Sequence, residues 1–284
     1  MKKTLIAIAL AAMMAPAWGA EVVSSNVVGY NKITLKPGYN AISGQFVPVG
    51  AETVSDILSI ADCTVLPSMD PDTETGFGFA RLQTWDPTGG YTTYEWTGEG
   101  IAEAWEQPGI DNKWMTVGAG AVANVSIDKG DGFWLWLDPE EVSENISFTV
   151  AGEVPNDNTV TVPLTAGYNL IANPFPQAID IQNIAFKNLP SMDPDTETGF
   201  GFARLQTWDP TGGYTTYEWT GEGIAEAWEQ PGIDNKWMTV GAGAVAENVL
   251  IGVGDSFWLW LDPTCENLSD DISAVFTNPA KPAN

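Results

Sequence analysis

Aromatic residues in this chain recur at a spacing that suits a flat ligand platform. Two groups of Trp and Tyr flank matching Gly-Gly turns, and the second group repeats the first in type and order. Tyr and Trp can stack a ring face on a sugar while one polar edge makes a hydrogen bond. The glycan-binding candidates are Trp85, Tyr91, Tyr94, Trp96, Trp208, Tyr214, Tyr217 and Trp219. The alternative interpretation is an aromatic-rich β core.

Alternating carboxylates form a second candidate site, in a loop that also occurs twice. Alternate Asp and Glu oxygens can converge on a hard cation such as calcium. The loop departs from the EF-hand pattern, because Thr75 stands at the glycine position and Arg81 at the bidentate Glu position. The calcium candidates are Asp70, Asp72, Glu74, Asp193, Asp195 and Glu197. A solvated Asp-Pro turn is the alternative.

Catalytic chemistry has few residues to work with. The chain contains no histidine, which removes the commonest general base and the usual catalytic triad. A glycosidase pair such as Glu95 with Glu103 or Asp111 is the remaining possibility, since two carboxylates must flank one bond. In so acidic a chain any two carboxylates can be nominated, so we expect no enzyme activity and keep a glycoside hydrolase as a remote alternative.

The first residues predict export. Residues 1–20 read as a signal peptide, with Lys2 and Lys3 before a short apolar stretch. The formal net charge of −26 disfavours nucleic acid and anionic lipid as partners and leaves polysaccharide or copies of the chain itself. We expect a secreted protein, periplasmic or extracellular and at the cell surface, with no membrane insertion after cleavage.

Two cysteines, Cys63 and Cys265, lie outside the duplicated stretch. In an exported chain an isolated pair favours a disulfide, here between the start of one repeat and the end of the other. A bond between two chains, or two free thiols, are the alternatives.

An internal duplication sets the domain organisation. The stretch from Leu66 to Ala123 recurs letter for letter from Leu189 to Ala246, and weaker similarity extends on both sides. Such a repeat predicts two copies of one domain. The expected divisions are the signal peptide 1–20, domains at 21–155 and 156–278, and a tail at 279–284.

Alternation of polar and apolar residues predicts mostly strands. Residues 82–85 and 91–96 flank a loop with hairpin chemistry. Residues 133–137 (FWLWL) are apolar on both faces, which predicts a central strand or a strand trapped between layers. Residues 52–61, with 178–185 as their counterpart, have helical spacing. We therefore expect an all-β fold of two tandem β-sandwich or barrel-like domains, each with about one short helix.

The motifs GYN(A/L)I, TWDPTGGYTTYEW and GDGFWLWL, with its copy GDSFWLWL, resemble a module of exported bacterial surface proteins. The pattern of that module runs roughly GWNLIGNP, then WDP..GY..Y, then PGQGFW. Tyr39 and Tyr168 replace its usual Trp, and Asp131 and Asp255 replace its usual Gln. The resemblance implies an all-β accessory module without catalytic residues.

These observations lead to one functional expectation and one alternative. The expectation is an exported, non-catalytic structural or adhesive protein of the cell surface or extracellular matrix, because linked repeats gain avidity. The alternative is a pair of carbohydrate-binding modules that use the Trp and Tyr platforms.

Overall fold

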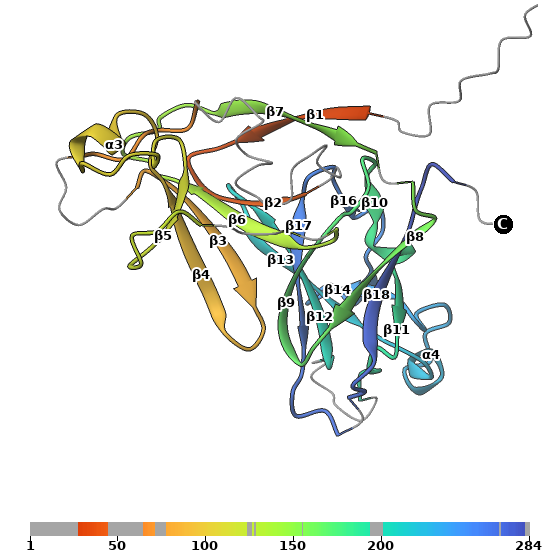
Figure 1. Ribbon diagram of the computed structural model, residues 1–284. Helices are drawn as coiled ribbons and strands as arrows, with labels where there is room; N and C mark the ends of the chain where they lie inside the picture. Colours follow the sequence, from red (N-terminus) through yellow and green to blue (C-terminus); the bar gives the residue numbers. More distant parts are fainter. Residues whose placement is uncertain are drawn as a thin grey trace, which may run out of the picture.

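The protein is nearly all β, as the alternation predicts (Figure 1). The computed structural model describes residues 28–44, 65–71, 78–123, 127, 129–154, 156–193, 201–266 and 268–281. The expected signal peptide, the expected helix at 52–61 and Cys63 lie outside these residues. So do four calcium candidates, Asp72, Glu74, Asp195 and Glu197. We refer to residues 28–154 as the first repeat and to residues 156–281 as the second repeat.

The first repeat is built around a five-stranded antiparallel sheet in the order β2-β6-β3-β4-β5. A two-stranded sheet, β1-β7, accompanies it. The elements are β1 (Val28–Leu35), β2 (Gly38–Ser43), β3 (Ala80–Asp86), β4 (Gly90–Trp96), α3 (Ile101–Ala104), β5 (Trp114–Thr116), β6 (Gly132–Leu137) and β7 (Ile146–Glu153).

The second repeat has the matching strand order β9-β17-β12-β13-β14, extended by β15. The accompanying sheet is β8-β18-β11, and β10 pairs with β16. The elements are β8 (Thr159–Leu164), β9 (Gly167–Ala172), β10 (Ile179–Asp180), η3 (Ile181–Asn183), β11 (Ala185–Lys187), β12 (Ala203–Asp209), β13 (Gly213–Trp219), α4 (Ile224–Ala227), β14 (Trp237–Thr239), β15 (Ala244–Val245), β16 (Leu250–Ile251), β17 (Ser256–Leu261) and β18 (Ile272–Thr277).

Each repeat has a core of its own, between its large sheet and its small one. In the first repeat Leu82 and Leu135 of the large sheet belong to the same buried cluster as Phe148 of β7. In the second repeat Leu205 and Leu259 cluster with residues of β8 and β18 in the same way. Burial of one face of every large-sheet strand leaves the opposite face for other contacts.

The hairpin and central-strand predictions are confirmed. β3 and β4 pair from Arg81–Glu95 to Asp86–Gly90. The FWLWL segment of β6 lies between β2 and β3. Its two apolar faces reflect two different environments, because Leu135 faces the core and Trp134 faces the other repeat.

The helix expected at residues 178–185 is wrong. The segment is a short strand, β10, followed by the single 3-10 turn η3 and by β11. The Asp180 carboxylate accepts a hydrogen bond from the Gln182 backbone N–H, which closes a tight turn. The Gln182 amide then donates to the Trp237 and Ala246 carbonyls, so the segment is tied to β14 and beyond. The short helices of the described chain are α3 and α4 instead.

Candidate binding cleft between the repeats

Strand alternation divides the eight aromatic candidates between two faces of each large sheet. Trp96 and Tyr217 are buried on the core face, with Trp96 only 1% exposed. Tyr94 and Trp219 are half-buried and pack against the same cores. A ring held in this way has no free face for a ligand. On the outer face, three candidates border a cleft: Tyr91, Trp208 and Tyr214.

The outer subset pairs across each hairpin. Trp85 and Tyr91 are opposite each other on β3 and β4, with ring centroids 4.8 Å apart. Trp208 and Tyr214 repeat this pair at 4.7 Å on β12 and β13. Both pairs lie on the faces that turn toward the other repeat, so the hairpin sequence supplies two equivalent aromatic arms.

Four further aromatic residues complete the cluster, two from each repeat. Trp134 and Trp258 are buried at 4% and 6% exposure and lie 6.5 Å apart. Tyr39 packs edge-on against Trp134 at 5.9 Å, and Tyr168 packs against Trp258 at 5.7 Å. The two indoles therefore form a floor, and each has a tyrosine beside it.

The arms of one repeat rest on the floor of the other. Trp85 meets Trp258 edge-to-face at 5.4 Å, and Trp208 meets Trp134 edge-to-face at 5.9 Å. This geometry suits the ring quadrupole. Figure 1 shows where this occurs: β2 and β6 run beside β17 near the middle of the molecule, and the β3–β4 hairpin extends from there.

A cleft opens over this cluster. It has a volume of about 270 Å³. Its rim consists of tyrosines that keep about half of their surface exposed: 46% for Tyr39, 50% for Tyr91 and 49% for Tyr214. The residues that line it are Tyr39, Gln83, Tyr91, Trp134, Trp208 and Tyr214. Tyr168, the repeat counterpart of Tyr39, is 46% exposed as well.

The cleft lining has no ionised side chain. Burial raises the pKa of Tyr91, and the nearby Tyr214 phenol adds to the effect. Burial likewise raises the pKa of Tyr214. Both phenols therefore keep their protons at neutral pH and can donate or accept hydrogen bonds. The Gln83 amide donates to the Thr93 hydroxyl at 3.1 Å, which fixes its orientation toward the cleft.

Charged groups on the same outer face neutralise each other. The Arg81 guanidinium lies 4.7 Å from the centroid of Trp136 and 3.5 Å from a Glu95 carboxylate oxygen. Burial raises the pKa of Glu95, while Arg81 opposes that rise. Arg204, Glu218 and Trp260 repeat the arrangement. Each of these two ion pairs therefore adds aromatic and polar surface without adding net charge.

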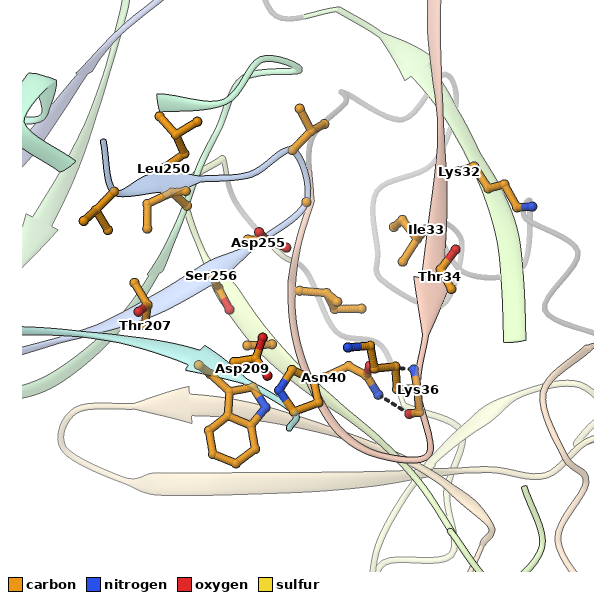
Figure 2. Close-up of a pocket in the computed structure, with 18 residues that line it drawn as sticks. Lys32, Ile33, Thr34, Lys36, Asn40, Thr207, Asp209, Leu250, Asp255 and Ser256 are labelled. Carbon is orange, nitrogen blue, oxygen red and sulfur yellow. Dashed lines mark hydrogen bonds between the residues drawn. The ribbon is translucent and has the colours of Figure 1, made fainter. Parts of the chain in front are cut away.

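Trp208 also lines a second hollow, of about 460 Å³, which Figure 2 shows in close-up. Lys36 lies just beyond the end of β1 and close enough to Asp209 to affect it, while the Lys32 side chain points away from Asp209. The pKa of Asp209 falls to about 2, because the Thr211 hydroxyl and backbone N–H donate to it, with help from the Gly212 N–H and from Lys36. Opposite charges face one space, so the hollow favours no single sign of ligand charge.

The described residues leave the metal and disulfide predictions untested. Asp70 and Asp193 are half-buried, and the other calcium candidates fall outside the described chain. Within the residues that are described, no three His, Cys, Asp or Glu side chains gather as a metal site requires. Cys265 is half-buried after β17, and Cys63 is not described. No helix in the described part is long and apolar enough to cross a membrane.

Sequence reasoning missed four residues of the aromatic cluster, Tyr39, Tyr168, Trp134 and Trp258, and also Gln83, which lines the cleft. A signal for four of them was present. Tyr39 with Tyr168, and Trp134 with Trp258, are kept in both repeats although they lie outside the identical block. A tyrosine kept in a diverged strand and half exposed in both copies is explained better by a ligand or a contact than by the core.

Comparison with known proteins adds no relative: the chain matches no protein-family model, no curated protein and no solved structure.

Proposed function

We propose that the protein is an exported, non-catalytic adhesive protein that binds an uncharged polysaccharide in the cleft between its repeats. The observation that carries the proposal is the rim of half-exposed tyrosines above two buried tryptophans. Exposed aromatic rings around a hollow are unusual on a surface with no partner. Flat ring faces with phenol and amide groups at their edges match the alternating apolar faces and hydroxyls of a sugar chain.

Charge supports an uncharged ligand. The chain has a formal net charge of −26, which repels acidic polysaccharide, nucleic acid and anionic lipid. The cleft itself has no cation in its lining that would offset this field. Hydrogen bonding and stacking, rather than ion pairing, therefore supply the affinity.

The lining also supports binding without catalysis. Glycoside hydrolysis uses two carboxylates placed on either side of one bond. None of the residues that line the cleft is Asp or Glu. Glu95, the carboxylate nominated from the sequence, forms an ion pair with Arg81 at 3.5 Å instead.

Affinity electrophoresis through gels that contain neutral polysaccharides tests the proposal. The test variant carries Tyr91→Ala and Tyr214→Ala, and the control carries Tyr30→Ala, a tyrosine on β1 that is 81% exposed and outside the cleft. A tyrosine ring covers roughly 150–250 Å², so covering the accessible half contributes at most about 2–3 kcal/mol at about 25 cal/mol per Å².

On that basis each rim tyrosine contributes a factor of at most about 100 in affinity. We expect retardation of the wild type and of the Tyr30→Ala control, and little or none for the double variant. Carboxylated polysaccharide should retard none of them. Free migration of the wild type in every neutral gel, or equal retardation of the double variant, refutes the proposal.

A further inference from the structure

The contacts between the two repeats come in equivalent pairs. The Trp85 indole N–H donates to the Tyr168 carbonyl at 2.7 Å, and the Trp208 indole N–H donates to the Tyr39 carbonyl at 3.1 Å. Trp85 and Trp208 are counterparts in the duplication, and so are Tyr39 and Tyr168. Each repeat therefore gives the other the bond that it receives.

The backbone follows the same rule. The Ser43 N–H donates to the Gly254 carbonyl at 3.0 Å, and the Ala172 N–H donates to the Gly130 carbonyl at 2.8 Å. Isolated antiparallel bridges join residue 42 to residue 255 and residue 131 to residue 171. A surface that contacts a copy of itself reciprocally is the isologous interface of two-fold dimers.

The position of closest approach on this interface differs between the repeats. Gly132 of β6 faces its counterpart Ser256 of β17, and a Cβ on residue 132 would lie 2.6 Å from the Ser256 Cβ. It would also lie 3.0 Å from Leu170. Two second repeats would place Ser256 against Ser256 at this close approach, which sterics forbid. The interface therefore rejects two second repeats and accepts a first repeat opposite a second one, whichever chain supplies it.

We propose that the partner for this interface is a second copy of the chain: the first repeat of one molecule pairs with the second repeat of another, and two molecules close into an exchanged dimer. Only the segment between Glu153 and Thr159 connects the repeats. A short linker holds them at an effective concentration on the order of 1 mM, so exchange competes when chains reach that density. Each exchanged dimer contains two clefts, both formed by residues of two chains.

A cysteine trap distinguishes exchange from other association. Residues 42 and 255 form a bridge across the interface, and facing strand positions lie close enough for a disulfide. The trap carries Ile42→Cys and Asp255→Cys, with Cys63→Ser and Cys265→Ser. Refolding takes place at about 10 µM and at about 1 mM chain, on either side of the effective concentration. Light scattering measures mass, and a non-reducing denaturing gel shows which chains are linked.

We expect the dimer fraction to rise from about a hundredth at the lower concentration to about half at the higher one, with disulfides between chains in the dimer and within the chain in the monomer. Adding Gly132→Ser should remove the dimer and also the disulfide within the monomer, since both depend on the same interface and the new side chain recreates the forbidden contact. Near-UV circular dichroism of the buried tryptophans shows whether each variant has refolded. The mass of the wild-type chain, measured at the same two concentrations, shows whether the dimer also forms without the introduced cysteines.

Natively refolded protein that stays monomeric at the higher concentration overturns the inference. So does a dimer that keeps its disulfides within each chain, or one that Gly132→Ser leaves unchanged. Binding of polysaccharide by a strictly monomeric protein would leave the proposed function standing while this inference fails.

Discussion

Asn40 is the residue whose replacement tests the structure most sharply. It is 6% exposed and sits just after the turn from β1 to β2. Its side-chain oxygen accepts from the Lys36 N–H at 2.9 Å. Its amide donates to the carbonyls of Lys36 at 2.8 Å, Gly38 at 3.1 Å and Leu135 at 3.2 Å. One amide therefore ties the turn to the central strand β6.

Asn40→Asp keeps the shape and removes the donor. The new carboxylate still accepts from Lys36 but faces three carbonyl oxygens that had been satisfied. Leaving a buried acceptor unpaired costs about 1–3 kcal/mol. The lost amide carries two N–H donors, so two carbonyl oxygens lose a partner and the free energy of unfolding falls by roughly 2–6 kcal/mol. This is a large share of the about 5–15 kcal/mol by which folded proteins are stable.

Urea unfolding followed by tryptophan fluorescence measures the loss, at pH 7 and again at pH 4. Carbonyl oxygens around the new carboxylate raise its pKa in the folded state above its unfolded value. A raised pKa for an acid means that the penalty applies above the folded pKa and is relieved as pH falls below it. The variant should therefore recover part of the lost stability at pH 4.

The repeat supplies a matched test and the surface supplies a control. Asn169 makes the same contacts, to Thr165, Gly167 and Leu259, so Asn169→Asp should lose a similar amount. Asn145→Asp adds the same charge at an exposed position and should change stability by no more than about 0.5 kcal/mol. The reasoning is refuted if Asn40→Asp lowers the free energy of unfolding no more than this control does, or if the loss is the same at pH 7 and pH 4.

Three other predictions follow from the contacts described above. Trp85→Phe and Trp208→Phe each remove one hydrogen bond between the repeats and should lower the free energy of unfolding, measured in urea, equally, by about 1 kcal/mol each; unequal losses would contradict the reciprocal interface. Asp209→Asn should destabilise the folded protein at neutral pH but not in acid, because the folded pKa of Asp209, about 2, lies below its usual 3.8. The stability that the carboxylate contributes is complete above about pH 4 and is lost as pH falls through about 2. A difference in melting temperature that does not change with pH would be inconsistent with this. Trp96→Ala should lower the free energy of unfolding by about 3–5 kcal/mol because the ring is wholly buried. The control Tyr30→Ala should change it by no more than about 0.5 kcal/mol. Similar denaturation midpoints for the two variants would show that Trp96 is not a core residue.

The sequence by itself determined the strands and the duplication. Period-two alternation and the turn after Trp85 predicted the β3–β4 hairpin, and the length of the repeat predicted that each element would recur. The retained Gly-Tyr-Asn motif also has a local reason. Gly38 and Gly167 adopt φ values of +90° and +88°, where a Cβ is strained, and Asn40 and Asn169 close the turns behind them.

Tertiary structure alone decided which aromatic rings face solvent. Alternation placed Tyr94 and Trp96 on one face of the strand and Tyr91 on the other, but it does not tell which of the two faces is buried in the core. That choice depends on the small sheet that covers the large one. The contact between Trp85 and Trp258 joins two residues that are far apart in the chain. The same limit explains the helix wrongly expected at 178–185, where bonds from Gln182 to distant carbonyls outweigh helical spacing. A cleft built from both repeats is a property of their packing, and no local pattern encodes it.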